Sequence, residues 1–180
     1  MSLNSLEYPH SSSQPPVLEK PVRRWPLPSW PIILLLALTL LYTSPREASE
    51  LPTIPDSIEY TVGAQRFATL GHFNIAINSA SFPSRYPPGF PVVFLSPLYA
   101  AFPTHLGVGI LVVLAAAIAA MLAAYALGYR LAGEWGGVAA AVTLPEVPTF
   151  NTWSRVIMSD VPFFALGMLG AWLYMQMRAS

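Results

Sequence analysis

Residues Leu106 to Tyr129 read LGVGILVVLAAAIAAMLAAYALGY, an apolar run without a formal charge. As a helix, such a run is long enough to cross the roughly 30 Å hydrocarbon core of a bilayer. The rest of the chain is similar in character, since 54% of its 180 residues are hydrophobic and only 10% are charged. A soluble domain has about one quarter charged residues. The sequence therefore predicts an integral membrane protein.

Other apolar segments predict further crossings on both sides of this run. We expect an all-α fold, a multi-span transmembrane helical bundle. The predicted spans are 30–44, 106–129, 136–149 and 161–177. Residues 1–28 are rich in Ser and Pro and predict a disordered cytoplasmic segment, which leaves 29–180 as the membrane domain.

Basic residues next to the apolar runs predict the topology. They are Lys20, Arg23, Arg24, Arg130 and Arg178. Because cytoplasmic loops are enriched in Lys and Arg, both termini are expected inside and the loop 45–104 outside. Asp56 and Asp160 then share the outer face, provided that the short third span crosses. The predicted location is the cell's inner (plasma) membrane, as a multi-pass protein.

Two segments of the outer loop are not predicted to cross the membrane. Residues 56–70 predict a helix with Tyr60, Ala64 and Phe67 on one stripe and Gly71 as its stop. Asp56 and Glu59 have the spacing of a capping box, and the helix is polar enough to lie on the membrane surface. Residues 87–103 contain five prolines, which predicts a surface-lying or half-inserted segment.

Three charged residues of the outer face are candidates for chemistry. Asp56 is either a helix cap or a general base, and the two roles are compatible. Arg85 is either an interfacial anchor or a bidentate partner for a phosphate group. Asp160 is either a cap of the last span or a functional acid, with Arg155 as one possible partner.

Several classes of site have no support in the sequence. His10, His72 and His105 have no metal-ligand spacing, and neither a P-loop nor a nucleophile elbow is present. The chain has no cysteine, its net charge is zero, and it has no basic cluster that suits a nucleic acid. We assign no certain cofactor, although a divalent metal ion is compatible with the acids.

Taken together in chain order, the polar segments indicate a protein family more specifically than any one of them does alone. They are Pro55-Asp56-Ser57 with Tyr60, then Arg85-Tyr86-Pro87-Pro88-Gly89-Phe90-Pro91, then Ser159-Asp160 before a span. This series resembles the amino-terminal part of the GT-C glycosyltransferases over residues 30–177. The nearest branch is the bacterial family that contains lipid A sugar transferases, protein O-mannosyltransferase-like enzymes and the aminoarabinose transferase.

The resemblance implies transfer of a sugar from a polyprenyl-phosphate donor at the outer face of the membrane, with inversion at the anomeric carbon. The acceptor would be a lipid, a protein or a glycan. Asp56 and Asp160 would be catalytic, and Arg85 would face the donor phosphate. The other residues that would contact substrate are Tyr86, Pro87, Pro88, Glu59 and Tyr60. Many relatives have a second acid after the first aspartate; here that residue is Ser57, and Glu59 is a candidate substitute.

Complete members of that family have many more spans than this chain. We therefore expect an amino-terminal portion, a truncated reading frame or half of a split protein, inactive on its own. The alternative function is a non-catalytic or degenerate integral membrane protein, or an assembly partner for other spans. A transporter fragment is a third possibility, but transporters carry their charged and broken-helix features near the bilayer midplane.

Overall fold

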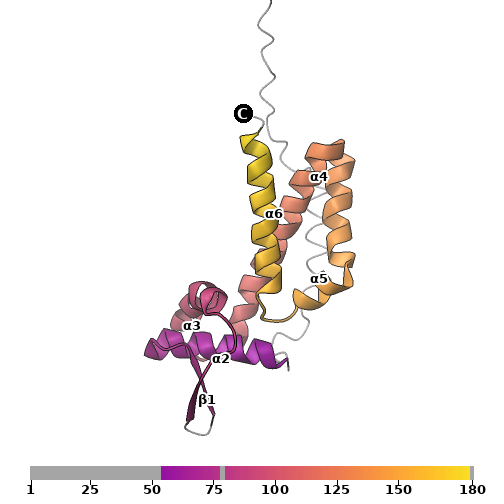
Figure 1. Cartoon of the computed structure of the whole chain (residues 1–180). Helices are drawn as coiled ribbons and strands as arrows, with labels where there is room; N and C mark the ends of the chain where they lie inside the picture. Colours follow the sequence, from indigo (N-terminus) through magenta and orange to yellow (C-terminus); the bar gives the residue numbers. More distant parts are fainter. Residues whose placement is uncertain (1–53, 78–79, 179–180) are drawn as a thin grey trace, which may run out of the picture.

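The computed structural model describes residues 54–77 and 80–178. The predicted segment 1–28 and the predicted span 30–44 lie outside the described residues. The described part is mostly helical, with one long apolar helix and one small sheet. Figure 1 shows two layers: helices α4 and α6 stand side by side, and a lower layer built around α2 lies across one end of them.

Helix α2 (Pro55–Leu70) forms the lower layer and closely matches the predicted helix. Pro55 occupies the first helical position, where a missing N–H costs nothing. Gly71 ends the helix with a φ of 73°, and its N–H donates to the Phe67 carbonyl oxygen at 2.9 Å. Glycine adopts this left-handed conformation without the steric cost that other residues incur, so the predicted stop is confirmed.

A two-stranded antiparallel sheet follows α2, so the expectation of an all-α fold was wrong in this segment. Strand β1 (Asn74–Ile77) pairs with β2 (Ala80–Pro83), with Asn74 opposite Pro83. An isolated hairpin is marginally stable in water, but this one packs against α2. The Arg66 Nε donates to the Asn74 Oδ1 at 2.6 Å, which ties the hairpin to the helix.

The proline-rich segment 87–103 forms two short helical elements. A single π-helical stretch, η1 (Pro91–Leu95), leads directly into α3 (Ser96–Ala101). The Ser96 N–H donates to the Pro91 carbonyl oxygen, and the buried Ser96 hydroxyl is 3.1 Å from both that oxygen and the Ala64 carbonyl oxygen. One serine therefore stabilises the wide turn and holds it against α2.

The long apolar helix begins with a 3₁₀ turn, η2 (Leu106–Gly109), and continues as α4 (Ile110–Glu146). Backbone angles depart from helical values at Ala132 and at Gly133, whose φ is 70°. At this point α4 reverses and becomes two antiparallel arms (Figure 1). Leu106–Glu146 is the one helical segment in the described residues that is long and apolar enough to cross a membrane.

The two arms of α4 come close together at Gly128 and Gly136, where neither arm has a side chain. A Cβ atom at Gly136 would lie 2.7 Å from the Gly128 carbonyl oxygen, and one at Gly128 would lie 2.9 Å from the Ala140 Cβ. Close packing of this kind is what small residues allow between helices in lipid. The glycines therefore set the separation of the arms.

Substituting Gly128 tests this packing. We expect Gly128→Ala to lower the stability of the detergent-solubilised protein by about 1–3 kcal/mol, because overpacking forces the arms apart. The measurement is the unfolding midpoint followed by circular dichroism. Gly167→Ala is the matched control, since a Cβ there meets no atom within 4 Å and alanine favours a helix. Equal midpoints for both variants would contradict the close approach.

Two further helices complete the fold. Helix α5 (Pro148–Trp153) follows the second arm, and α6 (Asp160–Met177) packs along α4. The core lies where the two layers meet. There the fully buried Tyr99 donates its hydroxyl to the Leu106 carbonyl oxygen at 2.7 Å and lies over Gly109.

Candidate functional site

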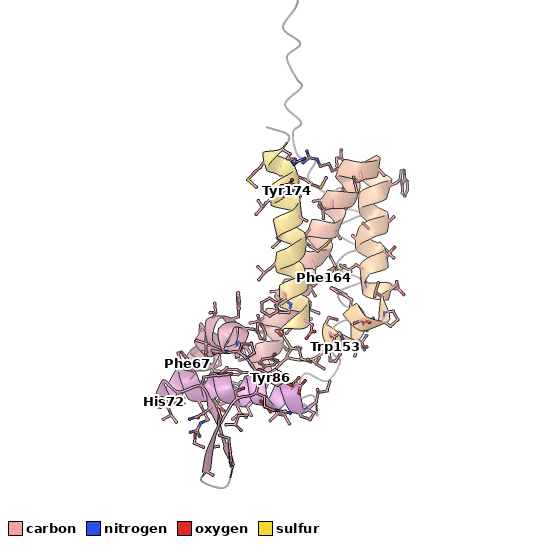
Figure 2. All side chains as sticks on the ribbon, in the orientation of Figure 1. Phe67, His72, Tyr86, Trp153, Phe164 and Tyr174 are labelled. Carbon is pink, nitrogen blue, oxygen red and sulfur yellow. The ribbon has the colours of Figure 1, made fainter. Side chains whose placement is uncertain are left out.

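The candidate site lies at the junction of the two layers, beside the first turns of α2. Asp56 and Glu59 are three positions apart on α2 and therefore share one face of the helix. Arg85 follows strand β2 and reaches back to that face. Figure 2 shows Tyr86, the next residue, in the same lower layer, whereas Tyr174 lies at the opposite end of α6.

Glu59 is the central acceptor of the site. Its Oε1 forms an ion pair with the Arg85 guanidinium and accepts a hydrogen bond from the Arg85 Nε at 2.6 Å. Its Oε2 lies 3.3 Å from the Arg85 backbone nitrogen and 3.5 Å from the Ser84 hydroxyl. Only 13% of the Glu59 side chain is exposed, against 64% for Arg85. Glu59 therefore fixes both the side chain and the backbone of the Arg85 loop.

Asp56 does not cap the helix, which corrects the capping-box interpretation. The cap position is Ile54, no side chain bonds the helix terminus there, and Glu59 bonds Arg85 instead of reaching back. The Asp56 Oδ1 lies 3.8 Å from the Arg85 Nη2, and 32% of the side chain is exposed. Asp56 is thus a carboxylate beside a cation, with part of its surface open to an incoming ligand.

Asp56, Glu59, Arg85 and Tyr86 form a cluster in which the two hydrogen-bond donors, Arg85 and Tyr86, stay protonated. The hydrogen bond to Glu59, and then the charge of Glu59, raise the pKa of the Arg85 guanidinium above its ordinary value. The pKa of the Tyr86 phenol is also raised, first by its hydrogen bond with Asp56 and then by burial. Arg85 remains a cation and Tyr86 remains an O–H donor at any ordinary pH.

The turn after Arg85 presents its prolines to solvent. Pro87 and Pro88 are exposed, and the Pro88 carbonyl oxygen accepts the Val92 N–H at 2.8 Å where the next helical segment begins. Tyr86 packs on the Tyr60 ring, with 5.0 Å between the ring centroids. This turn therefore has exposed proline rings and an aromatic contact to α2.

Asp160 is the first residue of α6, and its side chain is exposed. The cap position is the preceding Ser159, which makes no side-chain capping bond, so the capping interpretation of Asp160 was wrong as well. Within the described ranges, the Asp160 carboxylate has no hydrogen bond or ion pair, and Arg155 does not pair with it. This acid is free to meet a ligand.

A contact that the sequence did not indicate links Ser159, the residue before Asp160, to α2. The Tyr60 hydroxyl and the Ser159 hydroxyl are 3.2 Å apart, although the residues are 99 positions apart in the chain. Tyr60 lies one helical turn after Asp56, and Ser159 immediately precedes Asp160. The two predicted acids therefore belong to neighbouring segments at the same end of the molecule.

Two further candidates have clear places in the structure. Ser57, the residue after Asp56, is fully buried, and its hydroxyl has no partner among the described residues. Of the two acids near Arg85, Glu59 makes the closer ion pair. In the described part of the chain, no three His, Cys, Asp or Glu side chains gather closely enough to hold a metal ion.

Comparison with known proteins gave no match to a family model, to a curated protein or to a solved structure.

Proposed function

We propose that this chain functions in a membrane glycosyltransferase that transfers a sugar from a polyprenyl-phosphate donor at the outer face of the cell's inner (plasma) membrane. The observation that supports the proposal most is the gathering of Asp56, Glu59 and Arg85 beside the start of α6, where Asp160 stands. A cation for the phosphate and acids for proton transfer then meet at the end of apolar helices.

The exposed surface of α4 and α6 supports a membrane setting. Only 39% of the most apolar part of α4 is buried, whereas the core helix of a soluble protein is mostly covered. Large apolar side chains of both helices point outward: Leu111, Ile118, Leu122, Phe163, Phe164, Leu166 and Leu173. Exposed large apolar side chains along two neighbouring helices are typical of a surface that meets lipid. We propose that both arms of α4 and helix α6 cross the bilayer.

The proposed topology has a direct test in single cysteines. The chain has no native cysteine, so only introduced ones react. Ile58→Cys and Thr152→Cys should be labelled from outside by an impermeant maleimide, whereas Ala132→Cys should be labelled only after the membrane is opened. All three positions are exposed in the fold. Labelling of Ala132→Cys alone in intact cells would reverse the scheme.

The proposed reaction is a direct displacement at the anomeric carbon. The oxygen of an acceptor hydroxyl bonds to that carbon as the bond from the carbon to the phosphate oxygen breaks. The electron pair of the broken bond leaves with polyprenyl phosphate, and the acceptor's proton passes to the Asp56 carboxylate. We assign Asp160 the role of orienting the acceptor hydroxyl, and Arg85 that of balancing the phosphate charge.

The Arg85–Glu59 pair sets a condition on this reaction. Because Glu59 already holds the guanidinium, a phosphate must either share Arg85 or displace Glu59 from it. A permanently occupied Arg85 would favour the alternative function, a non-catalytic membrane protein or assembly partner. In that case the pair would serve only to fix the loop.

Lipid binding separates the two functions. Native mass spectrometry of the detergent-solubilised protein should detect bound polyprenyl phosphate and much less bound polyprenol of the same length, because the phosphate contributes the charged contact. Arg85→Ala should remove most of that preference. Equal binding of phosphate and alcohol by the parent protein would favour the non-catalytic alternative.

A further inference from the structure

Tyr60 contacts all three segments that carry the candidate site. It is a residue of α2, one turn after Asp56, and its ring is 5% exposed. The ring packs on Tyr86, next to Arg85, and meets Phe90 edge-on at a centroid distance of 5.7 Å. Its hydroxyl meets the Ser159 hydroxyl at 3.2 Å, next to Asp160.

This arrangement matters because Asp56 and Asp160 are held by different layers of the fold. Helix α2 packs mainly on η1, α3 and β1, whereas α6 packs mainly on α4. A hydroxyl pair that joins α2 to the start of α6 can therefore set how far apart the two acids lie. The Tyr60 ring alone fills space, but it fixes no direction toward Ser159.

We infer that Tyr60 is a positioning residue, which holds the Asp56–Arg85 cluster in register with Asp160 through its hydrogen bond to Ser159. This inference rests on the proposed function for what the acids do, but the bond itself is a property of the fold. Buried behind the cluster, Tyr60 acts through the groups that it holds. Misplacement by about 1 Å can cost about 10²-fold in rate, so a single such bond can matter.

A distance measurement tests the bond independently of activity. Nitroxide labels are attached to cysteines at the exposed positions Ile58 and Phe163. Pulsed electron paramagnetic resonance then gives the distribution of distances between the label on α2 and the label on α6. Tyr60→Phe and Ser159→Ala each remove one hydroxyl and keep the packing. We expect each variant, and the double variant, to shift or broaden the distance distribution to the same extent.

The matched control is Tyr174→Phe, at the far end of α6, which should leave the distribution unchanged. A shift in Tyr60→Phe with none in Ser159→Ala would overturn the inference, because the bond would then not be the cause. The inference would also be overturned if Tyr60→Phe, Ser159→Ala and the double variant all gave the distance distribution of the parent. Thermal melts confirm that every variant is folded.

The transfer assay of the complete natural protein separates this inference from the proposed function. We expect each single variant to lower kcat about 10-fold with little change in the KM for donor, and the double variant to lower it about 10-fold rather than 100-fold. A distance shift without any transferase activity in the parent would leave the positioning intact and refute the function. Activity at the parental level in both variants would refute the positioning alone.

Discussion

Asp56→Asn is expected to lower sugar transfer by about 10² to 10⁴-fold, which is the effect of losing a general base. Membrane abundance should hardly change. Because Asp56 is not the cap of α2, the amide loses the favourable charge at the helix start, about 0.3–1 kcal/mol, and the partly exposed ion pair with Arg85, which contributes little. Initial rates with a lipid-linked donor, normalised to the amount of protein in the membrane, give the comparison.

Glu146→Gln is the matched control for Asp56→Asn. Glu146 is an exposed acid at the lower end of α4, outside the cluster, so its amide should transfer sugar at the parental rate. If Asp56→Asn retains full activity and only its abundance falls, Asp56 has a structural role and another group takes the proton.

Arg85→Ala is expected to cause the second large loss, chiefly through poor use of the lipid-linked donor. Arg85→Lys keeps the charge but loses the forked geometry that binds two oxygens at once, so its donor curve should lie between those of alanine and the parent. Acceptor dependence should change little. The measurement is the rate against donor concentration for each variant.

The Glu59 carboxylate complicates this experiment, because removing Arg85 leaves a largely covered acid without its partner. The double variant Arg85→Ala, Glu59→Gln removes that penalty while the donor contact stays absent, so its donor curve should match that of Arg85→Ala. Arg155→Ala, which removes an exposed arginine outside the cluster, should behave as the parent. Superimposable curves for Lys, Ala and the parent would end the assignment of Arg85 to the phosphate.

Local sequence signals predicted much of this fold. The helical pattern 56–70 lies within α2, and the end of the helix at Gly71 follows from local chemistry, because glycine adopts the left-handed conformation that closes a helix. The apolar run 106–129 lies within η2 and α4, so the predicted helix is present there. The break in α4 at Ala132 and Gly133 lies between the predicted segments 106–129 and 136–149.

The contacts that shape the site could not be predicted in this way. Glu59 and Arg85 are 26 positions apart, and Tyr60 and Ser159 are 99 apart, so their pairing depends on how the layers pack. The capping interpretation of Asp56 failed because the cap position is Ile54, two residues before Asp56. The hairpin was missed because its strands are only four residues each and follow a helix directly.

Transfer of a labelled sugar tests the central claim most directly. Membranes that contain the complete natural protein are supplied with polyprenyl-phosphate donors that carry labelled hexoses or pentoses. We expect one donor to yield a labelled lipid, protein or glycan together with free polyprenyl phosphate, and Asp56→Asn to abolish both products. If no donor is consumed, the chain is not part of a glycosyltransferase of this kind; if the Asp56→Asn protein consumes the donor as fast as the parent, Asp56 is not the general base.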